Sequence, residues 1–249
     1  MKSVKIDFKR DPTWEYIEPI VPASEAIPDW FKNASPVLPN SKPYDGSTIT
    51  FKSCPAILDS LLQGYILPLW ADIWVEPSGE EIDGMSIPSF HWSNYLGGGA
   101  YGEPLITANY VGLSKGLLTV DEKSTAPMTW KLNSPWIIQT PKEYSLLVIP
   151  PLNNVDSRFE AVSGVICTDM FTSFLNIPFI WTAPPDYEGL IRQGTPLAQL
   201  IPFKREVFQQ ELGFITEDDM NREAACKHAL GGVFRNAYTK LFRKTALSK

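Results

Sequence analysis

Proline is the feature that most limits what this chain can fold into. The sequence has 22 prolines in 249 residues, and none follows Pro202. Proline has no backbone N–H and its ring blocks the interior of a helix, so long helices are excluded where prolines are dense. Eight tryptophans, nine tyrosines and thirteen phenylalanines add a preference for pleated surfaces. The sequence therefore predicts a mainly β fold up to about residue 203 and a helical tail after it.

Residues 47–203 are predicted to form one β-rich domain. Its apolar and β-branched runs are separated by Gly/Pro turns, which indicates a sandwich or barrel of short strands rather than βαβ units. A short helix is expected from Pro55, because proline suits the first helical position and Gly64 follows the apolar helical pattern. A turn is expected over residues 77–84. The expected strands are residues 47–52, 65–75, 128–138, 144–149, 159–167, 174–181, 189–192 and 196–203.

Residues 1–46 form a proline-rich lead-in that also carries Trp14, Tyr16, Trp30 and Phe31. Disordered segments contain few aromatic residues, so a loose tail is disfavoured. We expect an extended arm that lies over its own domain or over a neighbouring subunit.

The third predicted segment is residues 204–249, a basic helical tail. Thr216 and Asp219 have the spacing of a capping box, and Gly231-Gly232 is a candidate break between two helices. The stretch Lys204-Arg205-Glu206 is interpreted as a solvated exit from the last strand.

Charge is unevenly distributed along the chain. The net charge is −6, but the stretch from Ala224 to Lys249 holds six basic residues and no acidic one. Residues 1–223 carry 16 basic and 28 acidic side chains, so they repel a phosphate backbone, and this charge disfavours nucleic-acid binding. The longest strongly apolar charge-free run, residues 60–71, is too short to span a membrane. The charged first ten residues do not resemble a secretory signal, so we expect the cytoplasm of the cell that makes the protein.

Motifs for most catalytic chemistry are absent from the sequence. The two histidines, His91 and His228, are far apart, and the three cysteines (Cys54, Cys167, Cys226) lack the close spacing of a zinc site. No phosphate-binding Gly-x-x-x-x-Gly-Lys-Ser/Thr motif and no Gly-x-Ser-x-Gly turn occurs. We therefore predict no catalytic residue, no metal and no cofactor.

Two short patterns stand out within residues 164–203. Gly164, Ile166 and Asp169 form a hairpin pattern, and Ile191, Gly194 and the run Leu197-Ala-Gln-Leu form a second pattern after it. Together they resemble consecutive motifs in the C-terminal half of the dUTPase and dCTP deaminase superfamily. The resemblance implies a compact dUTPase-like β-clip fold, a homotrimer and nucleotide sites built between subunits.

The departures from that superfamily's pattern are the basis of the functional prediction. Cys167 stands where the resembled hairpin has an aspartate that orients the attacking water. A thiol cannot replace a carboxylate base, and its sulfur is a poor ligand for Mg²⁺. Cys167, Asp169 and Gln199 remain as candidate ligand-binding residues, although Asp169 could equally cap a turn and Gln199 could bond within the fold.

The chain as a whole also resembles a group of proteins encoded by bacteriophages and some bacteria, through the Ile27-Pro-Asp-Trp-Phe-Lys stretch and the Cys54-Pro-Ala-Ile-Leu-Asp stretch among others. That resemblance implies no activity. The favoured hypothesis is a non-catalytic, phage-type β-rich binding, structural or assembly protein with a degenerate dUTPase-like fold, whose partners are itself, a nucleotide, or a phage or host protein. The alternative is a nucleotide-processing enzyme with an altered active site.

Overall fold

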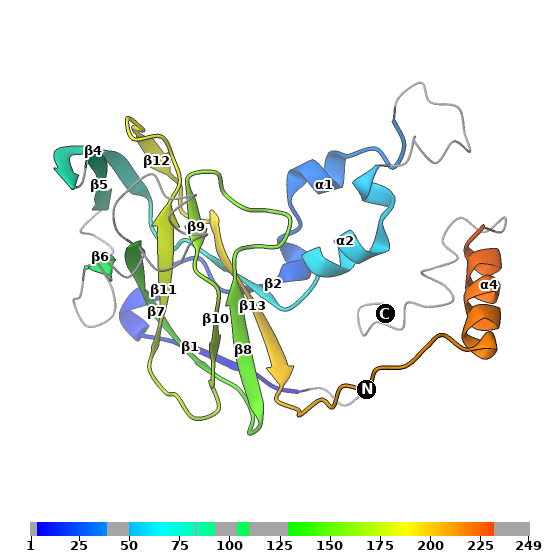
Figure 1. Cartoon of the computed structure of the whole chain (residues 1–249). Helices are drawn as coiled ribbons and strands as arrows, with labels where there is room; N and C mark the ends of the chain where they lie inside the picture. The colour runs from blue at the N-terminus through cyan, green and yellow to red at the C-terminus, as the bar shows by residue number, and fades with distance from the viewer. Residues whose placement is uncertain (1–3, 39–49, 83, 93–103, 110–128, 232–249) are drawn as a thin grey trace. The chain divides into compact units, whose positions relative to one another are not determined.

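The structure is a computed structural model of the chain, and it describes residues 4–38, 50–82, 84–92, 104–109 and 129–231 (Figure 1). The chain divides into two compact units. Residues 3–32 and 60–205 form the first, which we call the β unit, and residues 33–59 and 206–249, with 1–2, form the second. The predicted strand at residues 47–49 and the tail beyond Gly231 lie outside the described residues.

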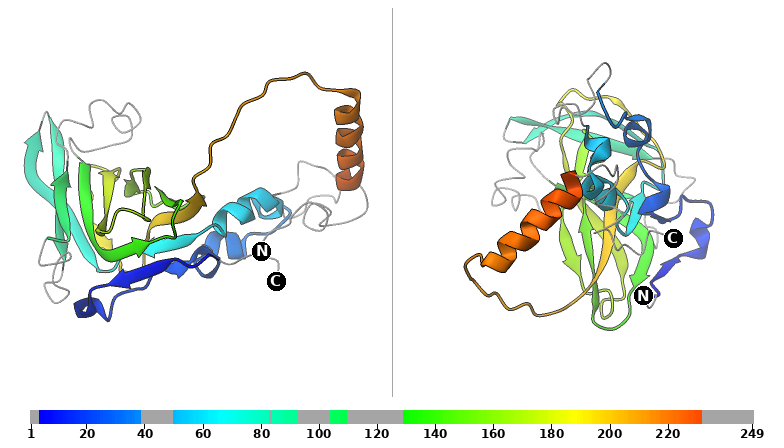
Figure 2. Two further views of the ribbon diagram at one scale, coloured as in Figure 1. Left: turned by 90° about the horizontal axis from the view of Figure 1, so that it is seen from below. Right: turned by 90° about the vertical axis from the view of Figure 1, so that its right-hand side faces the viewer.

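The β unit confirms the prediction of a mainly β fold. Its strands form three antiparallel sheets (Figure 2). They are β1 (Asp7–Arg10), β2 (Val21–Pro22), β3 (Tyr65–Pro68), β4 (Ile73–Ile82), β5 (Met85–Trp92), β6 (Ile106–Asn109), β7 (Thr129–Gln139), β8 (Tyr144–Ile149), β9 (Phe159–Ala161), β10 (Gly164–Ile166), β11 (Phe174–Trp181), β12 (Gly189–Ile191) and β13 (Pro196–Lys204).

The strand order separates the β unit into two larger sheets and one smaller sheet. In the β7 sheet the order is β1-β7-β11-β9, and β6 also pairs with β7. In the β13 sheet the order is β10-β8-β13-β3-β2, and the third sheet is β12-β4-β5. The strands that the structure describes therefore form open sheets and no closed barrel. Of the two predicted architectures, sandwich and barrel, the closed barrel is not formed by these strands.

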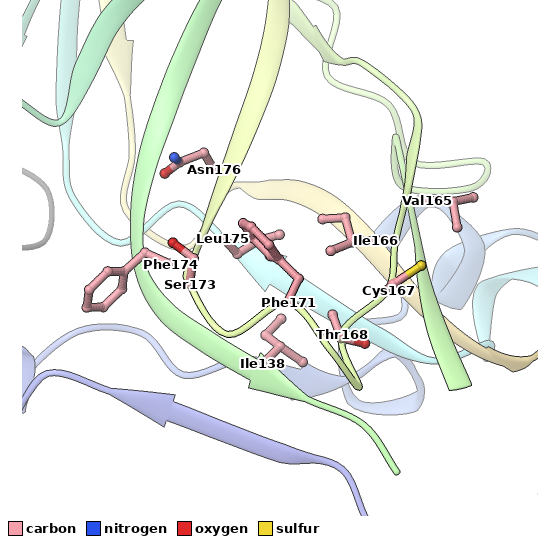
Figure 3. A pocket seen from close by; sticks show the side chains of 10 residues that line it. All are labelled: Ile138, Val165, Ile166, Cys167, Thr168, Phe171, Ser173, Phe174, Leu175 and Asn176. Atoms are coloured by element: carbon pink, nitrogen blue, oxygen red, sulfur yellow. The ribbon is translucent and has the colours of Figure 1, made fainter. Parts of the chain in front are cut away.

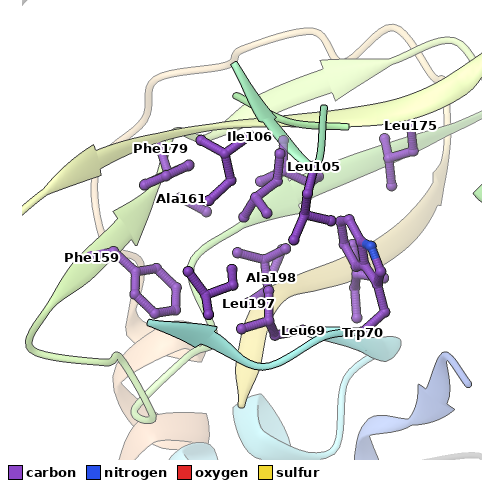
Figure 4. Close-up of a cluster of buried hydrophobic side chains, with 14 of the residues drawn as sticks. Leu69, Trp70, Leu105, Ile106, Phe159, Ala161, Leu175, Phe179, Leu197 and Ala198 are labelled. Atoms are coloured by element: carbon purple, nitrogen blue, oxygen red, sulfur yellow. The ribbon is translucent and has the colours of Figure 1, made fainter. Parts of the chain in front are cut away.

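The hydrophobic core draws side chains from both larger sheets (Figure 4). Trp181 of β11 and Leu200 of β13 are almost fully buried in one cluster with Leu146 of β8. At its edge, the ring of Phe90 meets Trp130 and Trp181 edge-to-face with centroids 5.5 Å from each. Such contacts bury large apolar areas and fix the orientation of the sheets.

Part of the lead-in packs on its own chain. β1 pairs with β7, and Trp14 is buried in the core cluster. Phe31 is buried too, whereas Tyr16 and Trp30 are exposed. Of the two predicted positions for the arm, the structure shows packing on the same chain for Trp14 and Phe31.

Two expected strands are each divided in the structure. The prediction of one strand over residues 65–75 is wrong at its centre, where Leu69 donates its N–H to Thr195 and accepts from Gly194. At this point the chain passes from the β13 sheet to the smaller sheet. Residues 69–71 are buried at this crossing, which explains why they are apolar without belonging to a strand. Residues 159–167 likewise divide into β9 and β10, which lie in different sheets.

The prediction of a turn over residues 77–84, made from its glycines and polar residues, is wrong for most of that range. Most of this range continues β4, which pairs with β5 through a register shift between Pro77 and Glu81. A bulge accommodates the proline, so the hairpin turn comes only after Ile82.

The helices are short. Helix α1 (Asp29–Asn33) and helix α2 (Pro55–Leu61) contain the points where the chain passes between units, and α2 confirms the helix predicted from Pro55. Phe51–Ser53 is a 3-10 turn, so the strand expected at residues 51–52 is wrong. Among the helices that the structure describes, none is long and apolar enough to cross a membrane.

Helix α4 (Glu217–Gly231) confirms the helical start of the tail. Asp219 donates its N–H to Thr216 Oγ1 at 3.2 Å, and Thr216 donates its own N–H to Asp219 Oδ2 at 3.0 Å. These reciprocal bonds form the predicted capping box, because each side chain satisfies a backbone N–H of the first turn.

Candidate functional site

The clearest cavity of the β unit lies where β10 of the β13 sheet faces β7 and β11 of the β7 sheet (Figure 3). Its volume is about 410 Å³, within the range of small-ligand pockets. Six of its ten lining residues are apolar. The lining consists of Ile138, Val165, Ile166, Cys167, Thr168, Phe171, Ser173, Phe174, Leu175 and Asn176.

The local sequence explains why a pocket opens here. β10 stops at Ile166, and the N–H groups of Met170 and Phe171 both bond to the carbonyl of Cys167. This tight turn sends the chain across to β11. Figure 3 shows Ile166, Phe171 and Leu175 gathered at the pocket, and Phe171 is more than half exposed.

Cys167 lies at the rim of this pocket. Its side chain is exposed, and Figure 3 shows its sulfur turned away from Phe171 and Leu175. Ser145 Oγ donates a weak hydrogen bond to the sulfur at 3.8 Å. Among the described residues, no histidine or carboxylate is hydrogen-bonded to Cys167, so the thiol lacks the adjacent base of a nucleophilic cysteine.

Asp169 follows Cys167 closely but has a different role. Its side chain is only 4% exposed and forms a bidentate ion pair with Arg205, with distances of 2.9 Å to Oδ1 and 2.5 Å to Oδ2. Glu143 donates its backbone N–H to Asp169 Oδ2 at 2.9 Å. The hydrogen bonds from Arg205 hold the pKa of Asp169 at about 2, below its ordinary value of 3.8. Asp169 is therefore a fixed anion and a poor general base.

Arg205 joins three parts of the β unit. Besides Asp169, it donates to Ser145 Oγ at 2.8 Å and to the carbonyl of Tyr144 at 3.0 Å. Its pKa is raised, mainly by the hydrogen bond to Asp169 and further by Cys167. The interpretation of residues 204–206 as a solvated exit is therefore wrong for Arg205.

A pair of buried threonines supports the same junction. Thr140 and Thr168 lie 2.7 Å apart at their hydroxyls, and Thr140 Oγ1 also donates to the carbonyl of Tyr144 at 3.1 Å. They connect the turn before β8 to the loop after β10. Sequence reasoning missed both threonines, because an isolated threonine in a turn gives no signal of a partner 28 residues away.

Gln199 does not line the pocket. It is almost fully buried and accepts the N–H of Leu152 at 2.8 Å. Its amide group donates to the carbonyls of Ser60 at 3.0 Å and Gln63 at 2.7 Å. These bonds leave Gln199 no free donor for a ligand, so of its two predicted roles the structure supports hydrogen bonding within the fold.

Arg158 is also engaged inside the protein. It bonds to both oxygens of Asp156 at 2.9 and 2.7 Å and to the carbonyl of Leu190 at 3.1 Å. The hydrogen bonds that Arg158 donates to Asp156 raise the pKa of Arg158. The side chain connects the loop before β9 to β12. Its guanidinium group is used in these contacts and is not available to bind a phosphate.

The described residues contain no group of three or more histidine, cysteine or acidic side chains placed to hold a metal ion. No protein-family model matches the chain, and a comparison with curated proteins finds no match.

Proposed function

We propose that this chain is a non-catalytic, phage-type binding and assembly protein with a degenerate dUTPase-like fold. Its pocket beside β10 binds a small ligand with an apolar body and one hydrogen-bonding edge. The observation that carries the proposal is the apolar cavity of about 410 Å³. Next to it, Asp169, the acid that could assist catalysis, is held in an ion pair by Arg205.

The chemistry of the lining supports this class of ligand. Ile138, Ile166 and Leu175 offer an apolar surface, and Thr168 and Asn176 offer polar atoms among the same lining residues. Apolar walls with a few polar groups are typical of small-molecule sites. A ligand with a high negative charge is disfavoured, because Arg205, the arginine nearest the loop, is already paired with Asp169.

The alternative is a nucleotide-processing enzyme. One observation favours it: the pocket forms around residues 164–171, the segment that resembles the hairpin motif of dUTPases. A nucleobase would match the apolar walls. Against it stand Cys167 in place of the hairpin aspartate and the ion-paired Asp169.

Self-association belongs to the same proposal. The resemblance implies a homotrimer, and Tyr16 and Trp30 are aromatic side chains of the lead-in that remain exposed. Exposed aromatics are frequent in interfaces between chains. Other partners in this proposal are a phage or host protein, and the place of action is the host cytoplasm, with the virion as the alternative.

Thermal denaturation of the full chain with a panel of ligands tests the pocket. Indole and phenol serve as aromatic probes, and uracil, dUMP, dUTP and dCTP as nucleotide-like probes. A ligand at 100 times its Kd stabilises the folded state by about 2.7 kcal/mol. We expect the aromatic probes to raise the midpoint temperature and the triphosphates to leave it unchanged.

Two neighbouring residues give a matched pair of variants. Phe171 lines the pocket, whereas Met170 is exposed and does not. Phe171→Ser should abolish the shift with aromatic probes, and Met170→Ser should keep it. An equal shift in both variants, or no shift with any probe, would overturn the proposed pocket, and a shift only with nucleotides would favour the alternative.

A further inference from the structure

The cavity beside β10 lies between the edges of two sheets. Its lining includes three successive residues of β11, namely Phe174, Leu175 and Asn176. Successive side chains of a strand point to opposite faces, so a cavity that touches three of them in a row lies at the edge of the strand. β10 lines the cavity as well and is the last strand of the β13 sheet. The cavity drawn in Figure 3 therefore separates two strand edges that belong to different sheets.

The strand β11 is fully paired on one side and only partly paired on the other. β7 pairs along one side of residues 174–179. On the other side β9 pairs with residues 179–181, and the N–H of Val162 extends this contact to the carbonyl of Pro178 at 2.8 Å. Among the strands that the structure describes, none pairs with this second side of residues 174–177.

The backbone of Asn176 offers a donor and an acceptor at this edge. Residues at alternate positions of a strand turn their N–H and C=O groups to the same side, so Asn176, like Pro178, turns them towards the side of β9. Its neighbour on β7 agrees, because Asn133 donates its N–H away from β11, to the carbonyl of Leu105 at 2.9 Å. The two asparagines are thus a pair without mutual backbone bonds. Among the described residues, no loop or side chain bonds to the N–H of Asn176.

The charge of the surroundings limits what can occupy the cavity. None of its ten lining side chains is charged. The β unit carries 12 basic and 20 acidic side chains, a net charge of −8, so it attracts basic partners and repels acidic ones. The occupant therefore needs an apolar group for the walls, N–H and C=O groups for the strand edge, and no negative charge. An extended basic peptide combines all three.

We propose that the pocket is the site where a partner protein adds an extended segment as a strand on the edge of β11. The added strand continues the row that β9 occupies beside residues 179–181 and bonds to the backbone of Asn176. One large apolar side chain of the segment enters the cavity between Ile166 and Leu175. Main-chain bonds of this kind give affinity, and the pocket for the side chain gives specificity. This inference rests on the pocket of the proposed function and names its ligand.

Titration calorimetry of the full chain with synthetic peptides tests the ligand class. The peptides are acetylated, amidated heptapeptides with lysine at both ends, threonine at the inner positions, and valine, leucine, phenylalanine or tryptophan at the centre. We expect at least one of them to bind. The same peptide with aspartate at its centre should bind about tenfold more weakly or less, because a charge would enter an apolar cavity. Glutamate at both ends should also weaken binding, because the β unit is acidic.

Methylation of the peptide backbone tests the strand pairing itself. Methyl groups on alternate backbone nitrogens remove the N–H groups of one edge of the peptide and leave its side chains unchanged, and the pattern can be made in two registers. At least one register should lose about tenfold or more in affinity, because a carbonyl at the strand edge is left without its donor.

Two variants at one position isolate the contribution of β11. Asn176→Pro and Asn176→Ala both remove the side-chain amide, but only proline removes the N–H at the strand edge. Pro178 already stands two residues further along the same edge, so the strand can hold a proline there. The proline variant should bind the peptide about tenfold more weakly than the alanine variant. Thermal midpoints report whether each variant is folded, and the methylated peptides test the same pairing on the unchanged protein.

The outcomes separate this inference from the proposed function. If indole or phenol raises the midpoint temperature but no peptide binds, or if both methylated registers bind like the parent peptide, strand addition is overturned and the pocket for a small ligand stands. If neither probes nor peptides bind, both are overturned. A peptide that binds and also dissociates an oligomer in light scattering would show that a second copy of the chain occupies the edge, and the assignment to a partner protein would be wrong.

Discussion

Arg205 and Asp169 form a bidentate ion pair across 36 residues of sequence. The pair joins the end of β13 to the loop that follows β10, and the N–H of Glu143 completes the carboxylate's contacts. Because both oxygens of Asp169 are occupied, the loop beside the pocket is fixed in place and its carboxylate is not free for proton transfer. One interaction thus positions the pocket and limits its chemistry.

The first prediction concerns acid stability. The folded-state pKa of Asp169 is about 2, below its ordinary value of 3.8. A depressed folded-state pKa stabilises the protein above the ordinary value, and the effect is lost as pH falls towards the folded value. The free energy of unfolding should therefore be lower in Asp169→Asn than in the parent at pH 7, and the difference should shrink between about pH 4 and pH 2.

Denaturant unfolding at several pH values measures this difference. Asp186→Asn, at an exposed aspartate elsewhere in the β unit, is the control and should show no comparable loss at pH 7. A loss in Asp169→Asn that stays constant down to pH 2 would show that the ion pair is not its cause.

The second prediction concerns Gln199. Gln199→Ala leaves the N–H of Leu152 and the carbonyls of Ser60 and Gln63 without their partner. Each buried group left unpaired costs about 1–3 kcal/mol, so the variant should lose about 3 kcal/mol or more in denaturant unfolding. Gln209→Ala, at an exposed position, should be neutral. If Gln199→Ala keeps its stability and instead loses ligand binding, its role is in a site.

The third prediction concerns Gly64, which has φ +63°. A Cβ there would lie 2.1 Å from the carbonyl oxygen of Leu200 on β13. Gly84 has φ +77° but has open space around it. Gly84→Ala should cost about 1–2 kcal/mol for its backbone conformation alone, and Gly64→Ala should cost clearly more in the same unfolding measurement. Equal losses would show that the chain relaxes around the clash.

Much of the fold could be predicted from local sequence. β8 and β11 match their predicted ranges because turn residues bound each apolar run. The capping box at Thr216 was predictable because its two partners are three residues apart. The division near Leu69 was not, because the run stays apolar while its backbone turns to bond with Thr195.

The candidate site was less predictable for the same physical reason. A sequence motif pointed to Asp169 and Cys167. The partner that determines the role of Asp169 is Arg205, and in the sequence Arg205 is only one of three charged residues that follow the last strand. The antiparallel register of β8 with β10 and β13 brings the two side chains together. Pairing between distant strands carries no local signal.

The last prediction concerns turnover. The full chain should not release pyrophosphate from dUTP or ammonia from dCTP at rates above about 1 s⁻¹, the low end of ordinary enzyme turnover. Two points support this expectation. In the sequence resemblance, Cys167 stands where a carboxylate is expected, and in the structure Asp169 is held by Arg205, while no histidine among the described residues is bonded to either.

Two cysteine variants make this measurement decisive. Cys167 lies at the pocket, whereas Cys226 is an exposed thiol in α4. Because no histidine or carboxylate among the described residues is bonded to the Cys167 thiol, and Cys226 does not line the pocket, Cys167→Ala and Cys226→Ala should both match the parent's background release. Release above that threshold which Cys167→Ala abolishes and Cys226→Ala preserves would make the thiol a catalytic group. The nucleotide-processing enzyme would then replace the binding protein as the better account of the pocket.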